Sequence, residues 1–290
     1  MSSFEWSLVS LLSSSIEQCE SIEFMPLTST DEYQVHCHCE ENRYLCINVE
    51  EIRQIVNLCY SLIFSKDALD NNQLNSVTRV LLCCITECLT SWNIRRRLVL
   101  AKNILIPQEL QFTEKLLYLR PKSEQLFRYR RWLIQTMNSI DEIPVAKEFE
   151  ICTRASERHF INYASWSYRR WVVDYFHVDL DEELNRNRLW LETNISDSSG
   201  FSYRGFLLSR KGFSEQLIEQ ELKLDENWLK FYVDRESIWI YRQTLVFIAL
   251  TISSIDRKAF LTKELDLVKI FPENFFSIRF SRLLNTLLSS

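Results

Sequence analysis

An aromatic residue followed three positions later by arginine recurs along most of the chain. The occurrences are Trp92-Asn-Ile-Arg95, Phe127-Arg-Tyr-Arg130, Trp166-Ser-Tyr-Arg169, Phe201-Ser-Tyr-Arg204, Trp239-Ile-Tyr-Arg242 and Phe276-Ser-Ile-Arg279. Successive arginines lie 35, 39, 35, 38 and 37 residues apart. A period of about 37 residues accommodates two helices and two turns, the size of a helical hairpin repeat. The even spacing therefore predicts an all-α solenoid of about five to six tandem hairpins.

Helical spacing within the repeats supports this prediction. Tyr163, Trp166 and Val173 fall at helical steps and are expected to form one apolar stripe. Arg169 lies beside Trp166, where it can bond a neighbouring helix, so we expect the six arginines to join adjacent repeats. Partner helices with Pro, Asp or Ser start signals are expected at Pro107–Leu119, Pro144–Phe160, Asp181–Thr193 and Ser214–Leu224. With only 3 Gly and 5 Pro, the chain has little turn chemistry for a β fold.

The first 70 or so residues lack this pattern. Residues 31–49 alternate, with Tyr33, Val35, Cys37 and Cys39 on one side, which predicts a small β-hairpin or an irregular cap. Helical spacing returns over residues 49–64. We therefore divide the chain into an N-terminal cap segment, residues 1–70, and helical repeats, residues 71–290.

Charge and cysteine usage restrict the environment of the chain. A formal net charge of -5 argues against a protein that binds mainly nucleic-acid phosphates. No stretch approaches the roughly 18 apolar residues of a membrane span, and Met1–Glu5 lacks the basic start of a signal peptide. Several of the 9 Cys lie in apolar helical patterns, as reduced core residues do. We expect a cytoplasmic protein without a membrane span.

Motifs for metal binding or nucleophilic catalysis are weak. His36-Cys37-His38-Cys39 places its ligands on adjacent residues, and no second pair of the zinc-binding kind accompanies it. Neither a Gly-x-Ser-x-Gly motif nor a phosphate-binding glycine loop occurs. We expect no metal site in this chain and disfavour an enzyme that acts alone.

Basic residues cluster in and before the signature segments, at 95–97, 128, 130–131 and 169–170. They could bind an anionic ligand or an acidic partner on one face of a solenoid, or they could be solvated or join helices. Lys122 directly precedes the second signature helix. A lysine there can meet an anion together with free backbone N–H groups, although an exposed loop lysine is the simpler interpretation.

Asn162-Tyr-Ala-Ser-Trp-Ser-Tyr-Arg-Arg-Trp171 resembles the Asn-Tyr-x-x-Trp-x-x-Arg repeat of the protein prenyltransferase α subunits. Residues 90–97, 123–132 and 236–242 resemble neighbouring repeats, and the resemblance covers roughly residues 70–285. Within the family, the segment 195–204 is most similar to the repeat-containing branch that supplies the type III geranylgeranyltransferase α subunit. The resemblance implies a right-handed α-α superhelix, a crescent that wraps a separate β subunit.

The resemblance also implies a function. The chain would be the α subunit of a heterodimeric protein geranylgeranyltransferase, inactive alone, which transfers a geranylgeranyl group from its diphosphate to a protein cysteine. The expected partner is a β subunit of the Rab geranylgeranyltransferase type, which would hold the zinc ion and most of the isoprenoid pocket. No cofactor is expected in this chain.

Three site residues follow from the resemblance. Lys122 matches the family's lysine near the isoprenyl diphosphate and would stabilise charge on the leaving group. Asn162 and Tyr163 would line the substrate interface. Ser123-Glu124 stands in place of Asn-Tyr beside Lys122, and Ala164 replaces a histidine of the farnesyltransferase α subunits. The alternative is a helical-repeat scaffold that binds proteins without prenylating them, as tetratricopeptide arrays of about 34-residue period do.

Overall fold

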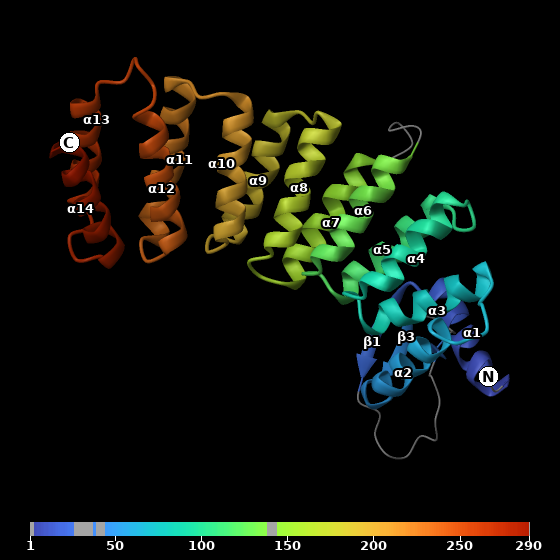
Figure 1. Ribbon diagram of the computed structural model, residues 1–290. Coiled ribbons are helices and arrows are strands. Elements are labelled where there is room, and N and C mark those ends of the chain that lie inside the picture. Colours follow the sequence, from blue (N-terminus) through green and yellow to red (C-terminus); the bar gives the residue numbers. More distant parts are fainter. Residues whose placement is uncertain (1–2, 26–36, 39–43, 138–143, 290) are drawn as a thin grey trace. The chain divides into compact units, whose positions relative to one another are not determined.

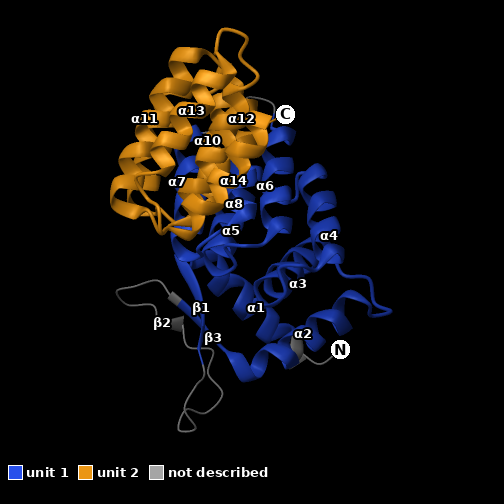
Figure 2. Cartoon of the chain, turned by 90° about the vertical axis from the view of Figure 1, so that its left-hand side faces the viewer, with its two compact units in different colours: residues 1–169 blue, residues 170–290 orange. Residues whose placement is uncertain are grey.

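The computed structural model describes residues 3–25, 37–38, 44–137 and 144–289 (Figure 1). It contains tandem helical hairpins, as the aromatic and arginine period predicts. The chain divides into two compact units, residues 1–169 and 170–290 (Figure 2). In the described ranges, no helix is both long and apolar enough to cross a membrane.

Unit 1 begins with helices outside the predicted repeats and continues into the first hairpins. Its helices are α1 (Ser3–Gln18), α2 (Ile52–Ile63), α3 (Asn71–Cys84), α4 (Leu89–Leu100), α5 (Ile106–Leu119), α6 (Glu124–Thr136), α7 (Val145–Arg158) and the first half of α8 (Tyr163–Phe176). Local signals determine several starts. Asp70 and Gln73 form a capping box at α3, Pro107 stands in the first turn of α5, and the Ser123 hydroxyl accepts from the Leu126 N–H at α6.

Unit 2 contains the remaining hairpins. Its helices after α8 are α9 (Leu180–Thr193), α10 (Ser198–Lys211), α11 (Glu215–Tyr232), α12 (Glu236–Ala249), α13 (Arg257–Val268) and α14 (Phe275–Ser289). Asp179, Ser214 and Asp256 cap α9, α11 and α13 with side-chain oxygens. The structure extends α11 beyond the predicted end at Leu224, because Trp228 and Leu229 continue its buried face.

A small sheet stands at the N-terminal side of unit 1. Its strands are β1 (Ser21–Met25), β2 (Cys37–His38) and β3 (Tyr44–Asn48), in the order β1-β3-β2. β2 and β3 pair antiparallel, as the expected hairpin requires, whereas β1 pairs parallel with β3 and was not expected. The predicted hairpin residues Tyr33, Val35 and Cys39 lie outside the described residues. A short 3-10 helix, η1 (Val49–Glu51), leads from β3 into α2.

Aromatic rings link successive repeats and define their register. The signature aromatic of one repeat contacts the ring two positions after the signature aromatic of the next. The centroid distances are 4.4 Å for Trp92–Tyr129, 5.1 Å for Phe127–Tyr168, 5.2 Å for Phe201–Tyr241 and 5.9 Å for Trp239–Phe280. These offset and tilted contacts lie in the range that aromatic pairs prefer.

The last ring pair corrects the sixth predicted signature. Phe280 occupies the position that a tyrosine holds in the other repeats, two residues after the signature aromatic. The aromatic position of the sixth repeat is therefore Ile278, and its arginine position is Ser281. Phe276 and Arg279 each lie two residues before these positions. The Arg279 side chain is accordingly 69% exposed, where it meets Glu236 at 3.2 Å. Asn274 confirms the shifted register, since its Oδ1 accepts from Ser277 N–H as that of Asn162 accepts from Ser165 N–H.

Candidate functional site

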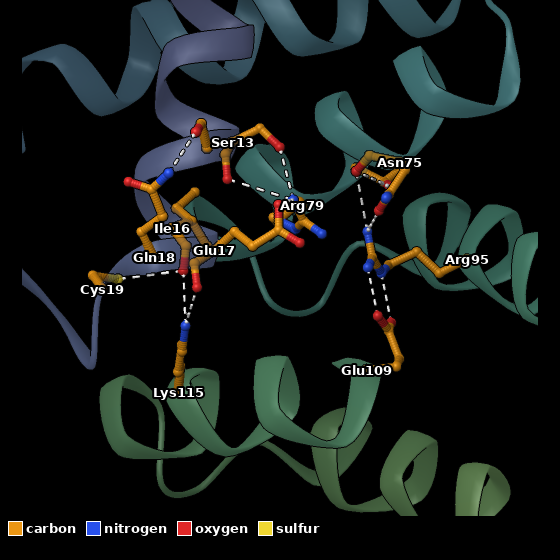
Figure 3. A network of polar contacts seen from close by, with 12 residues as sticks. Ser13, Ile16, Glu17, Gln18, Cys19, Asn75, Arg79, Arg95, Glu109 and Lys115 are labelled. Atoms are coloured by element: carbon orange, nitrogen blue, oxygen red, sulfur yellow. Dashed lines mark hydrogen bonds and ion pairs between the residues drawn. The ribbon is translucent and has the colours of Figure 1, made fainter. Parts of the chain in front are cut away.

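Arg95 of α4 is hydrogen-bonded to both α3 and α5 (Figure 3). We call such a buried arginine, together with its bonded partners, a joint. Its Nε and Nη2 donate to the two carboxylate oxygens of Glu109 in α5, at 2.6 and 2.5 Å. Its Nη1 donates to the carbonyl oxygen of Asn75 and the hydroxyl of Thr78, both in α3 and both at 3.1 Å. The Arg95 side chain is fully buried, so this bidentate pair replaces the water that the charges lose.

The bidentate pair with a glutamate recurs at three further signature arginines, and a fourth, Arg169, is also buried. Arg130 binds Glu148, Arg204 binds Glu221 and Arg242 binds Glu264, each through two N–H donors at 2.7–2.9 Å. Arg169 donates to Thr153 at 3.0 Å and lies over the rings of Phe149 and Trp166. All of these arginines are buried, so they join helices and offer no surface to a ligand.

Asn162 fixes the turn that carries Lys122. Its side chain is fully buried, and its Nδ2 donates to the Pro121 carbonyl oxygen at 2.7 Å and to the Ala155 carbonyl oxygen at 3.0 Å. Its Oδ1 accepts from the N–H of Ser165 in the first turn of α8. Asn162 therefore holds the turn before α6 against the start of α8, and its own side chain does not reach the surface.

Lys122 and Tyr163, which follow Pro121 and Asn162 in the chain, are both exposed. Lys122 lies in the turn between α5 and α6. Tyr163, at the start of α8, is 67% exposed, whereas Trp166 and Val173 are buried. The predicted apolar stripe of α8 thus excludes Tyr163, although the next three residues, Ala164, Ser165 and Trp166, are buried.

A hollow of about 420 Å³ lies between α6 and α8. It is lined by Glu124, Phe127, Arg128, Arg131, Tyr163, Ala164, Ser167 and Tyr168. Arg128 pairs with Glu124 at 3.1 Å, and both side chains are largely exposed. With two arginines and one glutamate, the lining carries a formal excess of one positive charge. Such a hollow suits an anionic group accompanied by an apolar or aromatic one.

The structure divides the predicted site residues. Tyr163 lines the hollow, whereas Asn162 and Lys122 do not. Asn162 is bonded instead to Pro121, in the turn that carries Lys122. Of the basic clusters, only Arg128 and Arg131 reach the hollow. The sequence signal for the lining was the step of three and four residues from Glu124 through Phe127 and Arg128 to Arg131, which places these side chains on one helix face.

The part of the chain that the structure describes contains no cluster of metal-binding side chains. No three His, Cys, Asp or Glu side chains come together there in a way that could hold a metal ion. The motif at residues 36–39 lies outside the described residues, apart from the backbone of Cys37 and His38.

Three consecutive hairpin segments match the family model described as the protein prenyltransferase alpha subunit repeat, at residues 106–137, 145–176 and 180–211. These three segments are repeats of the protein prenyltransferase α-subunit type. The first two matched segments contain both walls of the hollow and the Lys122 turn.

The chain has relatives in two named groups. It is 30% identical over 189 residues to protein prenyltransferase alpha subunit repeat-containing protein 1 of Homo sapiens, covering 57% of this chain and 46% of the relative. Protein 1-B of Xenopus laevis is 26% identical over 240 residues, covering 61% and 55%. The geranylgeranyl transferase type-2 subunit alpha of Sus scrofa is 32% identical over 178 residues, covering 54% and 30%. The chain thus spans about half the length of the first two relatives.

A solved structure shares the fold. The chain resembles the Candida albicans protein geranylgeranyltransferase-I complexed with GGPP, with a TM-score of 0.59 over 92% of this chain and 96% of that chain. At 20% sequence identity, this likeness concerns the fold alone.

Proposed function

We propose that this chain is the α subunit of a cytoplasmic, heterodimeric protein geranylgeranyltransferase. The pair would transfer a geranylgeranyl group from its diphosphate to a protein cysteine, and the chain alone would be inactive. The observation that carries the proposal is the positively charged hollow beside the Asn162-anchored Lys122 turn, within two matched family repeats. The names of the type-2 transferase relatives and the GGPP complex support the choice of isoprenyl group.

The proposed reaction is a substitution at the first carbon of the isoprenyl chain. A sulfur–carbon bond to the protein cysteine forms, the carbon–oxygen bond to the diphosphate breaks, and the thiol proton passes to solvent. Negative charge then grows on the leaving diphosphate. The ammonium group of Lys122 stabilises that charge from the exposed turn, as a fixed electrostatic contribution rather than as a proton donor.

The other site residues orient the substrate. Asn162 positions Lys122 through the Pro121 carbonyl and is a positioning residue. Tyr163 offers an exposed ring and hydroxyl at the rim of the hollow. Arg128 and Arg131 attract the anionic end of the substrate toward α6.

A partner chain supplies what these residues do not. We propose a β subunit of the Rab geranylgeranyltransferase type, with the zinc ion bound there, a choice that the name of the type-2 transferase relative supports. Burying a hollow of this charge against another subunit would also strengthen its electrostatic effect.

Reconstitution tests the proposal. The chain is co-expressed with a Rab-type β subunit, and transfer of labelled geranylgeranyl to a mixture of cysteine-containing protein substrates is measured, with farnesyl diphosphate as the comparison donor. We expect transfer by the pair and none by either chain alone. A stable pair that prenylates no thiol would instead support the non-catalytic protein-binding scaffold. Failure of the two chains to associate would exclude this partner.

A further inference from the structure

One arginine joint carries an extra acidic group. In each joint the arginine Nη1 also contacts a side chain on the preceding helix. That side chain is neutral at Thr78, Thr113, Thr153 and Asn187, the partners of Arg95, Arg130, Arg169 and Arg204. At Arg242 it is Asp225. The last joint of unit 2 therefore places two carboxyl groups on one guanidinium group.

Asp225 is buried, and only one of its two carboxyl oxygens accepts a hydrogen bond among the described residues. The residue is fully buried in α11, and its Oδ2 accepts from Arg242 Nη1 at 3.0 Å. Its Oδ1 meets no donor among the described residues. Arg242 is already engaged by both oxygens of Glu264 in α13. An ionised Asp225 would thus leave one excess negative charge and one unsatisfied oxygen in the core.

The surrounding groups do not neutralise this excess. Glu221, one turn earlier on α11, is paired with Arg204 of α10 and accepts from the Tyr241 hydroxyl of α12. Two arginines, 204 and 242, thus face three acidic side chains, 221, 225 and 264. Burial, opposed by Arg242 and reinforced by Glu264 and Glu221, raises the pKa of Asp225 to about 7.

We propose that the Asp225–Arg242–Glu264 joint is a proton-dependent fastening between α11, α12 and α13. When Asp225 is protonated, Arg242 and Glu264 form a neutral pair like that of the other joints. The proton then resides on Asp225 Oδ1, the oxygen that accepts no hydrogen bond among the described residues. Loss of that proton leaves the excess charge in the core, which is relieved by admitting water and loosening α13, together with α14 that packs on it.

The contribution of Asp225 to stability depends on pH because folding raises its pKa. Because the folded carboxyl group holds its proton to a higher pH than the unfolded one, the folded state binds more protons between those two pKa values. Stability is therefore fully present at low pH and falls as the pH rises toward about 7. Above that value no further loss from this group is expected.

Hydrogen exchange of the full chain at pH 5.5 and 8 tests the fastening. After normalisation to the rates of unstructured peptides, we expect protection of α13 amides to fall on the order of tenfold or more at the higher pH. Asp225→Asn, isosteric and unable to ionise, should remove this dependence while α10 amides behave as in the unchanged chain. Equal pH responses in the unchanged chain and Asp225→Asn would overturn the proposal.

A second variant introduces the extra carboxyl group into another joint, so that the proposal does not depend on the folding of Asp225→Asn alone. Asn187→Asp adds a second carboxyl group to the Arg204 joint, where Asn187 Oδ1 accepts from Arg204 Nη1 at 3.3 Å and its Nδ2 donates to the Gly200 carbonyl oxygen at 3.1 Å. We expect new pH-dependent exchange around α9 and α11 in this variant, on top of that at α13. An Asn187→Asp chain whose folded state shows no new dependence would contradict the charge argument.

Discussion

The Tyr129 hydroxyl donates to the carboxylate of Glu109, 20 residues earlier, at 2.9 Å. The same step joins Tyr168 to Glu148, Tyr203 to Glu183 and Tyr241 to Glu221, each at 2.7–2.8 Å. The Glu109 carboxylate also accepts hydrogen bonds from Arg95, so this one buried group in α5 links α4 to α6. The repeat is therefore defined by a glutamate as much as by its aromatic and arginine.

Glu109→Ala should destabilise the chain strongly. Removing it leaves the buried guanidinium of Arg95 and the hydroxyl of Tyr129 without their shared acceptor, a change that costs about 3–5 kcal/mol. Tyr129→Phe, which removes one hydrogen bond and keeps the ring, should cost about 1 kcal/mol. Urea unfolding measures both. As a control, Glu226→Ala removes an exposed contact with Lys230 and should change the unfolding free energy by less than about 0.5 kcal/mol.

Asn162→Ala should destabilise unit 1 by about 1–3 kcal/mol, because two buried carbonyl oxygens and one N–H lose their partner. Asn162→Asp keeps the acceptor at the start of α8 but loses both donors. If Asn162 acts mainly as a helix cap, the Asp variant should recover most of the stability. If it acts mainly by holding the Pro121 carbonyl, the Asp variant should be no more stable than the Ala variant, and denaturant titrations of the three proteins distinguish these results.

Lys122→Ala should lower kcat of the reconstituted transferase about 10- to 100-fold, since one fixed positive charge near the leaving group is lost. KM for the isoprenyl diphosphate and association with the β subunit should change little. Lys102→Ala, an exposed lysine in the turn between α4 and α5, is the matched control. Equal kcat in the two variants would remove Lys122 from the mechanism and leave the transferase assignment itself intact.

Cys88 should react with iodoacetamide at lower pH than Cys59 and Cys84. Burial acts to raise the pKa of Cys88, but hydrogen bonds from Ser91, Thr90 and Tyr60 outweigh it and lower the pKa at the start of α4. Burial raises the pKa values of Cys59 and Cys84 to about 12. Mass spectrometry of each peptide across a pH series gives the order of alkylation. Tyr60→Phe should shift the Cys88 profile to higher pH, and simultaneous labelling of all three thiols would contradict the expectation.

The hairpins could be predicted from the sequence because large aromatic residues, which must be buried, recur once in each hairpin. The start of α6 at Ser123 and of α11 at Ser214 also follows from local capping chemistry. The sixth register was misassigned because Phe276 supplies an aromatic residue two positions early. Asn274-Phe-Phe-Ser277, which matches Asn162-Tyr-Ala-Ser165, was the signal that would have corrected it.

The sheet and the hollow could be predicted only in part. β1 is short and gains its place from pairing with β3 and packing against α5, contacts that no local pattern records. The hollow depends on which faces of α6 and α8 remain uncovered. Sequence spacing grouped the residues of each helix but could not show that Tyr163 would lie outside the buried stripe.

The repeated arginine joint has a consequence for how such chains change length. Each joint presents the same chemistry to the hairpin before it and to the hairpin after it, so removal of one whole period between two arginines would bring compatible ends together. Removal of half a period would instead leave a buried guanidinium group or carboxylate without its partner. Proteins of this kind that gain or lose hairpins should therefore do so in complete units from one arginine to the next. The joint thus determines which lengths of insertion or deletion the fold tolerates.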